Sequence, residues 1–501
     1  MRRYLTHRAG PASVPIPRDL SGLRGRAAPV GVTLRRQGTV VAVHVRDEGD
    51  LLRNVIAAAL QAMRSSKLPD RVDRKVLEAL TVEVDVLSPR RPVEQGELAG
   101  AFVPGLTGIA YARCAPTTVP ARRRAGRSWV LPAAGYILGL DAGQMRRGAM
   151  IRFRLTSANA SLPPRLEVFT TRHFVGLPGG RFVELYRGKD LSRRTVRPEA
   201  FDGAAEMVGR FLAVRQRADG RYTNGEKAPP LRDHLYATWA MARLASKPRH
   251  AGLSESVAKA IAHAVGLAER RSDEAWLPAE DANNPLVETS LLSLALAAAP
   301  GTGPDPLSKP LARWIVSRLA ATKASQAARP LPSGPYLAIL ALRSGPGAEE
   351  LPSILRVLKQ HRPADVVAKA WACRAGVAAA LLPGGGRTAT QPAITQRGAD
   401  ALADEVGGVC RLGGAPETVL TGLAAACWGE ARKQLSGTAA ERIRRRWMAA
   451  RTFCHAMMYQ PDEAYYAADP ATWVGGVRSS PARAEITVAA CAAAMDALLA
   501  E

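Results

Sequence analysis

Three segments in the second half of the chain gather the residue types that carry out acid–base chemistry. Residues 217–230, 271–284 and 460–481 each combine carboxylates with Tyr, Trp or Asn side chains. Two carboxylates held on either side of a glycosidic bond can donate and accept protons, and aromatic rings can support a sugar ring. These segments therefore predict a site for a polar glycan or another polar small molecule.

Catalytic and ligand-binding candidates lie within and beside these segments. Asp233, His234 and Glu288 are the catalytic candidates, because each falls in the first turn of a predicted helix. The ligand-binding candidates are polar or aromatic: Asp219, Tyr222, Glu280, Asp281, Tyr465, Tyr466, Trp473, Arg478 and Glu485. A structural role fits several of these positions equally well, since Asp219-Gly220 is ordinary turn chemistry.

The expected helix position also predicts protonation states. The positive end of a helix dipole favours a carboxylate, so the pKa of Asp233 is expected to be lowered, which suits a base or a cation-binding role. His234, with an ordinary pKa near 6.5, is the expected proton donor. Adjacent helical residues point about 100° apart, so each needs a partner elsewhere.

The cysteines argue against disulfide and metal chemistry. Six Cys in 501 residues are too few for a disulfide framework, and no Cys-x-x-Cys pair occurs. Cys373, Cys427 and Cys491 lie in apolar helical segments, where a thiol behaves as a small hydrophobe. A reducing compartment is therefore expected, and no metal is expected. The sequence also has no phosphate loop, so no bound cofactor is expected.

The charge and the hydropathy of the sequence limit which partners and which cellular location can be expected. Lys and Arg total 69 against 44 Asp and Glu, a formal net charge of +25. The 58 Arg are scattered along the chain without a nucleic-acid-binding motif, so no specific nucleic acid is expected. The basic N-terminus precedes no apolar run and no stretch approaches 18 apolar residues. We therefore expect a cytoplasmic protein that does not bind membranes.

The first part of the chain alternates polar and apolar residues with period two. Residues 30–35 and 39–45 flank Gln37-Gly38 and predict a hairpin. Apolar residues at helical spacing predict a helix over 50–63 that Asp50 caps. Further strands are predicted at residues 81–87, 108–113, 128–131, 151–156, 166–172 and 181–185. An α+β domain with a mixed sheet and a few helices follows.

This region resembles the AMMECR family, named after the Alport-syndrome, midface-hypoplasia and elliptocytosis chromosomal region. The resemblance covers roughly residues 20–190 and is carried by VGVTLRRQGTVVAVHV, LTVEVDVLSPRRPVE, LTGIAYAR and RSWVLP. It implies an α+β fold, a cytoplasmic setting, and a radical-SAM enzyme or a Memo-like protein as partner. The family carries Leu-Arg-Gly-Cys-Ile-Gly on the second strand, whereas this chain has Val40, Val41, Ala42 and Val43. Chemistry centred on that motif is therefore not expected here.

The second part predicts helices of two alternating kinds. One kind is amphipathic, over residues 203–216, 255–270, 306–322, 350–361, 394–405 and 438–459. The other is apolar nearly all round, over residues 231–245, 285–299, 335–343, 366–382, 416–435 and 482–499. Helices apolar on every side must be surrounded by protein. Six hairpins closing into an all-α (α/α)6 toroid satisfy both kinds, and QRADGRY with DHLYATWAMARLA resembles toroids of glycan-processing enzymes and isoprenoid cyclases.

The expected organisation places the site at one end of the toroid. It divides the chain into an N-terminal extension at 1–20, an AMMECR-like domain at 21–190, a linker at 191–202 and a toroid at 203–501. Inner helices of such a ring run in the same direction, so their N-termini converge on one mouth. The three polar segments are then consecutive around that mouth.

Two functions from different classes fit this organisation. The first is an accessory or substrate-binding protein of a radical-SAM and Memo-type modification system, with a polar cavity in the toroid. The alternative is an acid/base enzyme, a hydrolase, lyase or epimerase, that acts on a polar glycan at the toroid mouth.

Overall fold

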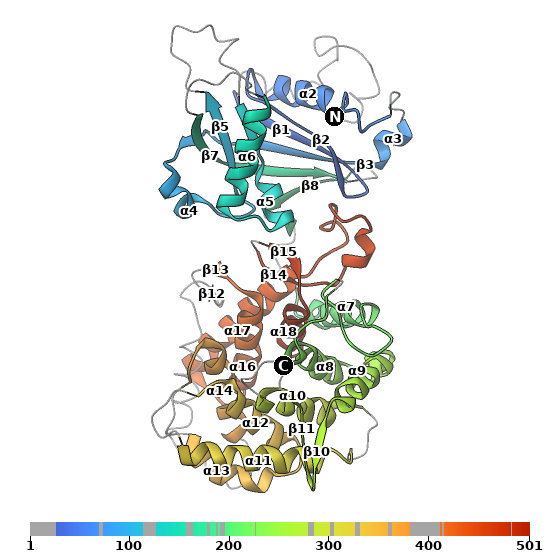
Figure 1. The fold of residues 1–501 in the computed structure, drawn as a ribbon, viewed down its shortest axis with the longest axis vertical. Helices are drawn as coiled ribbons and strands as arrows, with labels where there is room; N and C mark the ends of the chain where they lie inside the picture. The colour runs from blue at the N-terminus through green and yellow to red at the C-terminus, as the bar shows by residue number, and fades with distance from the viewer. Residues whose placement is uncertain are drawn as a thin grey trace. The chain divides into compact units, whose positions relative to one another are not determined.

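The computed structural model divides the chain into two compact units (Figure 1). The first comprises Met1–Arg194, Gln460–Trp473 and Pro481–Glu485, and the second Thr195–Tyr459, Val474–Ser480 and Ile486–Glu501. We call them the sheet unit and the helical unit. The structure describes residues 27–69, 74–113, 127–156, 164–177, 181–186, 189–190, 196–225, 227–278, 285–300, 305–325, 331–358, 363–380, 411–412, 415–481 and 483–500.

One antiparallel sheet organises the sheet unit. Its main strands run in the order β2 (Thr39–Arg46), β1 (Val30–Arg36), β3 (Leu80–Leu87), β7 (Pro164–Gly176), β5 (Thr107–Arg113) and β6 (Arg127–Val130). β4 (Arg91–Pro92) and β8 (Phe182–Tyr186) also pair with β7, and β9 (Lys189–Asp190) pairs with β8. Each strand pair among the described residues is antiparallel, so the prediction of a mixed sheet was wrong. The predicted hairpin at Gln37-Gly38 is confirmed.

Helices pack around this sheet, on both of its faces. They are α2 (Leu51–Ala62), α3 (Arg74–Ala79), α4 (Leu98–Ala101), α5 (Pro132–Leu138) and α6 (Ala142–Thr156). Asp50 caps α2 as predicted, accepting a hydrogen bond from the backbone N–H of Arg53 at 2.9 Å. Alternate residues of β1, from Val30 to Leu34, pack against α2.

The predicted strand at 151–156 is instead the end of α6. Met145, Ala149 and Phe153 are four residues apart and all buried, so they form a helical stripe that packs on the sheet. The short alternation of Ile151, Phe153 and Leu155 imitates a strand only when the preceding turns of the helix are left out.

Six helices of the helical unit pack in a closed cycle. They are α8 (Leu231–Ala245), α10 (Pro285–Ala298), α12 (Ser333–Ser344), α14 (Val366–Ala380), α16 (Thr418–Ala431) and α18 (Val488–Leu499). Each packs against the next, and α18 packs against α8. They coincide with the segments predicted to be apolar all round, which the structure confirms as buried.

A second set of helices lies against this cycle. α7 (Ala200–Val214), α9 (Ser254–Gly266), α11 (Ser308–Ser325), α13 (Leu351–Leu358) and α17 (Gly437–Met457) bury one side each and correspond to predicted amphipathic segments. The predicted helix at 394–405 lies outside the described residues. Short strands occupy connections: β10 (Glu269–Arg271), β11 (Glu274–Trp276), β12 (Arg411–Leu412), β13 (Ala415–Pro416), β14 (Arg478–Ser480) and β15 (Arg483–Ile486).

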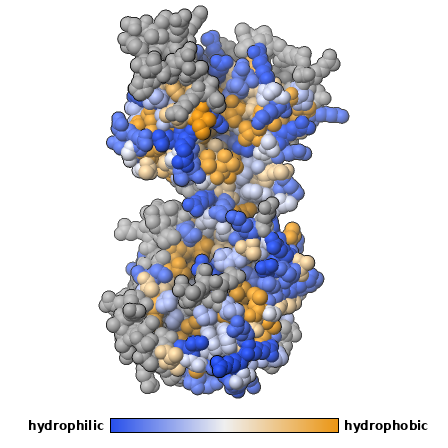
Figure 2. Space-filling view, viewed as in Figure 1, coloured by the Kyte–Doolittle hydropathy of each residue, from blue (hydrophilic) through white to orange (hydrophobic). Residues whose placement is uncertain are grey.

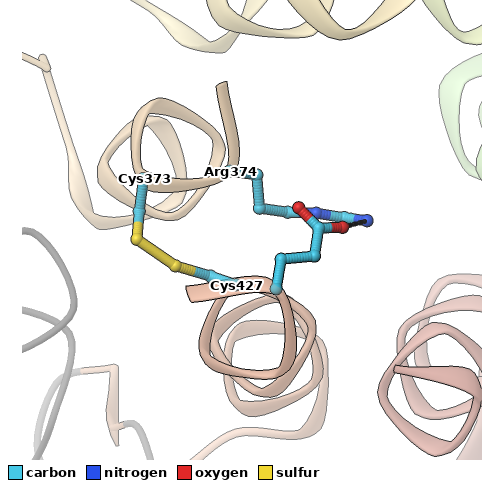
Figure 3. Close-up of a disulfide and its surroundings, with 4 residues drawn as sticks. Cys373, Arg374 and Cys427 are labelled. Atoms are coloured by element: carbon cyan, nitrogen blue, oxygen red, sulfur yellow. Dashed lines mark hydrogen bonds and ion pairs between the residues drawn. A yellow bond between two sulfur atoms is a disulfide. The ribbon is translucent and has the colours of Figure 1, made fainter. Parts of the chain in front are cut away.

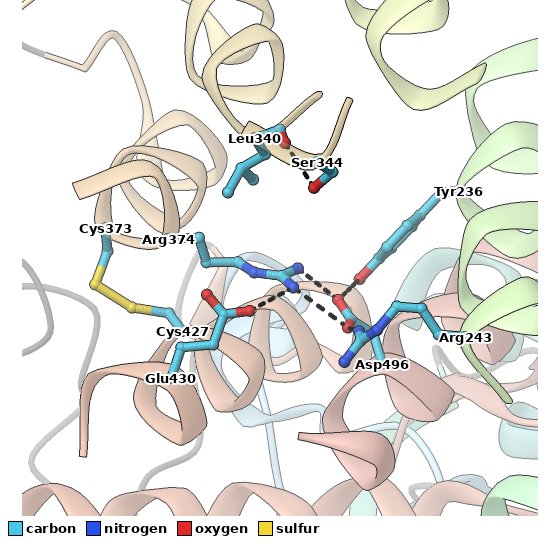
Figure 4. Close-up of polar contacts among 9 residues, drawn as sticks. All are labelled: Tyr236, Arg243, Leu340, Ser344, Cys373, Arg374, Cys427, Glu430 and Asp496. Atoms are coloured by element: carbon cyan, nitrogen blue, oxygen red, sulfur yellow. Dashed lines mark hydrogen bonds and ion pairs between the residues drawn. A yellow bond between two sulfur atoms is a disulfide. The ribbon is translucent and has the colours of Figure 1, made fainter. Parts of the chain in front are cut away.

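A buried ion network crosses the interior of the cycle (Figure 4). Arg374 on α14 donates to the Asp496 carboxylate on α18 at 2.6 Å and to Glu430 on α16 at 2.9 Å. The Tyr236 hydroxyl and the Arg243 guanidinium, both on α8, bind the same Asp496. Because α8 and α14 are not neighbours in the cycle, these contacts fasten helices across it. The two cations and the two anions of this network are paired with one another. A structural role therefore explains the network.

A disulfide between Cys373 and Cys427 joins α14 to α16 beside this network (Figure 3). The two Cα atoms lie 6.1 Å apart. The prediction that both thiols act as small hydrophobes was therefore wrong for this pair, because sequence spacing does not show that two helices bring them together. Cys491, by contrast, is a free, buried thiol.

Candidate functional site

The predicted catalytic pair lies in the first turn of α8, but His234 does not face an open mouth. Its imidazole is buried, its Nδ1 accepts from the Tyr222 backbone N–H at 3.4 Å, and its Nε2 lies 3.4 Å from the Ala260 carbonyl of α9. The rings of Tyr222 and His263 pack against it. The imidazole therefore fills the space between α8 and α9.

The protonation states predicted for this pair were wrong. Burial lowers the pKa of His234 to about 4, so the imidazole is neutral near pH 7 and is not a proton donor there. Burial raises the pKa of Asp233, and the adjacent Arg232 offsets only part of that rise. Desolvation of the Asp233 carboxylate thus outweighs the neighbouring charge of Arg232, and the lowered pKa expected from the helix end does not occur. Glu288, in the first turn of α10, is also buried.

The predicted ligand-binding residues do not gather around one mouth. Asp219 is exposed and bonds to Arg221, whereas Tyr222 is fully buried. The Arg478 guanidinium is buried 3.8 Å from the ring centre of Tyr459. Glu485 is exposed on β15. Glu280 and Asp281 lie outside the described residues.

Tyr465, Tyr466 and Trp473 belong to the sheet unit, through the segment Gln460–Trp473. Gly38, in the hairpin turn between β1 and β2, has a φ of +73°, and a Cβ there would lie 2.5 Å from backbone atoms of Tyr466 and Ala467. Arg181 forms an ion pair with Asp462 of the same segment. The segment 460–473 is therefore seated on the hairpin, which sequence adjacency to the helices did not reveal.

The second face of the sheet is polar and yet buried. Thr33 and Arg35 of β1 and Glu83 and Asp85 of β3 are each at most 6% exposed. In the strand register, Thr33 lies opposite Glu83 and Asp85 lies opposite His173 of β7. Paired residues of neighbouring strands share a face, so these side chains meet.

A hydrogen-bonded chain joins these groups to Tyr465. The His173 Nδ1 lies 2.9 Å from Asp85 Oδ1, and its Nε2 lies 3.2 Å from the Tyr465 hydroxyl. Glu83 lies 3.4 Å from the same Nε2 and binds the Arg35 guanidinium. The imidazole thus stands between a carboxylate and a phenol, an arrangement that can hold and pass on a proton.

The electrostatics favour a protonated imidazole. Burial by itself lowers the pKa of His173, but the carboxylates of Asp85 and Glu83 outweigh it, so the pKa of His173 is raised. Burial, together with Glu83, raises the pKa of Tyr465 well above its ordinary value of 10.0. The phenol therefore stays neutral, and the proton shared along this chain is held by His173.

A pocket opens onto this chain of groups. Its empty volume, including the open mouth, is about 370 Å³. Asp85, Thr171, His173 and Tyr465 supply its polar lining. The rest of the lining is Gly105, Leu106, Pro132, Ala133, Tyr136, Leu185 and Tyr186. We call this the Asp85 pocket. Over the described residues we found no group of three or more His, Cys, Asp or Glu side chains placed to hold a metal ion.

Sequence analysis predicted Tyr465 but missed its partners Asp85 and His173. The signal was present in TVEVDVL, where Glu83 and Asp85 alternate with valines and so share one face. Alternation does not show whether a polar face is covered. The cover comes from Tyr465, 382 residues after Glu83.

Comparisons with known proteins give little guidance. No family model and no curated protein matches the chain. A solved structure of an uncharacterized protein from Pyrococcus horikoshii aligns with 37% of this chain and 90% of its own length, at 20% identity and a TM-score of 0.29. That similarity is too low to carry an argument about fold or function.

Proposed function

We propose that the protein is a two-domain substrate-binding or accessory protein whose small-molecule site is the Asp85 pocket. One observation carries the proposal: Asp85 lines the pocket, and its Oδ2 atom is buried and has no hydrogen-bond partner among the described residues. An unsatisfied buried acceptor costs about 1–3 kcal/mol, which a ligand that donates a hydrogen bond would recover.

The helical unit is, in this proposal, an (α/α)6 toroid that serves as a scaffold. The closed packing cycle of α8, α10, α12, α14, α16 and α18 supports a toroid. The network around Asp496 fills part of its interior with paired charges. We therefore place the polar cavity in the sheet unit instead of the toroid.

The sheet unit is proposed to be AMMECR-like and to work with a radical-SAM enzyme or a Memo-like protein. Support comes from the sequence resemblance over residues 20–190.

We also propose a cytoplasmic location, where the Cys373–Cys427 bond would have to survive the reducing glutathione pool. Among the described residues, no helix combines the length and the apolar character needed to cross a membrane. Figure 2 shows hydrophilic residues spread over the visible face of both units, as the scattered arginines predict.

The alternative is an acid/base enzyme acting on a polar glycan or similar substrate. The arrangement of His173 between Asp85 and Tyr465 favours it, because Asp85 would hold in place the imidazolium from which His173 gives a proton to the substrate. The chemistry then belongs to the Asp85 pocket, since His234 is neutral and enclosed.

Protein-observed NMR tests the proposed site. The imidazole signals of His173 are followed by NMR while methyl glucoside, ethylammonium or acetate is added to the full chain. We expect at least one probe to shift them saturably, and His173→Gln to identify the signals. His44, on β2 and outside the pocket lining, is the internal control. If no probe moves His173, or His44 moves equally, the pocket is not a binding site.

A further inference from the structure

Asp85 offers the pocket one free acceptor. Its side chain is 1% exposed, its Oδ1 is engaged by His173 at 2.9 Å, and its Oδ2 has no hydrogen-bond partner among the residues that the structure describes. Because Asp85 lines the pocket, a bound molecule can reach that side chain. The acceptor therefore points to a ligand group that donates hydrogen bonds.

The charges around the pocket favour a cationic donor. Arg35, the guanidinium in this cluster, is already bound to Glu83 and to the Gly38 carbonyl. Among the lining residues that the structure describes there is neither Lys nor Arg, and His173 is the single basic side chain of that set. Two carboxylates thus face one paired arginine and one histidine. Arg35 and a protonated His173 already balance the two carboxylates, so a bound cation would take the place of the His173 proton, whereas a carboxylate or phosphate ligand would meet Asp85 with repulsion.

Aromatic rings supply the remaining recognition. Tyr136, Tyr186 and Tyr465 all line the pocket. The face of a tyrosine ring attracts an ammonium or guanidinium group within about 6 Å of its centre. A buried carboxylate among aromatic rings is a combination suited to such head groups.

We propose that the Asp85 pocket binds a cationic nitrogen group, an alkylammonium or a guanidinium, on the free oxygen of Asp85 beside its tyrosines. The inference rests on the proposed function of this pocket as a binding site and names the class of its ligand. The cation is the head group of a larger molecule, since the pocket is open on one side and Tyr186 at its edge is 48% exposed.

The test uses an isosteric pair of probes on the full chain. Methylguanidinium and methylurea have nearly the same shape, but only the first is charged. Binding is followed by the His173 imidazole signals and by calorimetry. We expect methylguanidinium to bind at least about tenfold more tightly than methylurea, and Asp85→Asn to remove about that tenfold preference.

Two further variants keep the result interpretable. Asp47→Asn is the matched control, because Asp47 pairs with Arg90 and Arg127 in the same unit and does not line the pocket. Should Asp85→Asn fail to fold, as judged by its melting curve, Tyr186→Leu leaves Asp85 in place. It should weaken methylguanidinium binding roughly threefold and methylurea binding little.

The outcomes separate this inference from the proposed function. Equal binding of both probes, lost together in Asp85→Asn, overturns the cation inference and leaves the pocket as a binding site. Methylguanidinium binding that survives Asp85→Asn overturns the inference as well. If none of the probes, including the sugar and acetate, moves the His173 signals, both the cation inference and the proposed binding site are overturned.

Discussion

At the scale of single residues, burial decides the chemistry more than helix position does. His234 and His173 have the same side chain, yet the pKa of one is lowered to about 4 and that of the other is raised. The difference is in their neighbours: His234 lies against Tyr222 and His263, whereas His173 lies between two carboxylates. Sequence position predicted the first turn of α8 but not these neighbours.

His234 is expected to make the stability of the protein pH-dependent. Its folded pKa of about 4 lies below the unfolded value near 6.5, so its neutral form stabilises the fold above pH 6.5. That contribution, about 3 kcal/mol at most, is lost as the pH falls from 6.5 to 4. His234→Gln should flatten this part of the unfolding free energy measured against pH. An unchanged slope in His234→Gln would contradict the enclosed imidazole.

At the scale of elements, most helices and strands could be predicted, because periodicity reports local geometry. The all-apolar segments became the buried helices of the cycle. Periodicity does not report which helices meet, so Arg374 and Asp496 were missed. The signal was Arg374 in the middle of VVAKAWACRAGVAAA and Asp496 inside VAACAAAMDALL, since an unpaired buried charge is too costly to keep.

Removing one charge of this network should be more harmful than removing both. Asp496→Asn leaves Arg374 and Arg243 without their shared anion, which is expected to cost about 3–5 kcal/mol in the free energy of unfolding. The double variant Arg374→Met, Asp496→Leu should recover part of that loss. The measurement is urea unfolding of the single and double variants. Additive losses would show that the pair is not coupled.

The disulfide between α14 and α16 has a direct chemical test. Digestion without reductant should yield a peptide pair linked through Cys373 and Cys427, separated by 54 residues. Cys373→Ser should lower the free energy of unfolding by about 2–4 kcal/mol. Cys491→Ser, at a buried free thiol in the same unit, is the control and should respond to reductant as the unaltered chain does, because it keeps the bond, whereas Cys373→Ser should not respond. Two alkylated thiols at Cys373 and Cys427 would refute the bond.

At the scale of the whole molecule, the candidate site depends on residues that are far apart in the sequence. Glu83 and Tyr465 are separated by 382 positions, so no local pattern links them. Sequence reasoning assigned residues 460–473 to the helices that flank them. Residues 460–473 belong to the sheet unit because the backbone of Tyr466 and Ala467 packs closely against the turn at Gly38.

Gly38 is therefore expected to matter beyond its own turn. Gly38→Ala adds a methyl group 2.5 Å from the backbone of Ala467 as well as strain at positive φ. Gly139→Ala is the matched control, since Gly139 has a φ of +63° and no described atom lies within 4 Å of the place where its methyl group would stand. We expect strain of about 1 kcal/mol in the control and a larger loss in Gly38→Ala, with shifted His173 signals. Equal losses would contradict the seating of segment 460–473.

The most direct measurement is the NMR titration of His173 against pH in the full chain, with and without methylguanidinium. The account predicts a His173 pKa above 6.5 in the free protein, because Asp85 and Glu83 stabilise the imidazolium. It also predicts that methylguanidinium lowers this pKa, since a cation on Asp85 competes with the charged imidazole. A His173 pKa at or below 6.5 that methylguanidinium leaves unchanged would contradict the account.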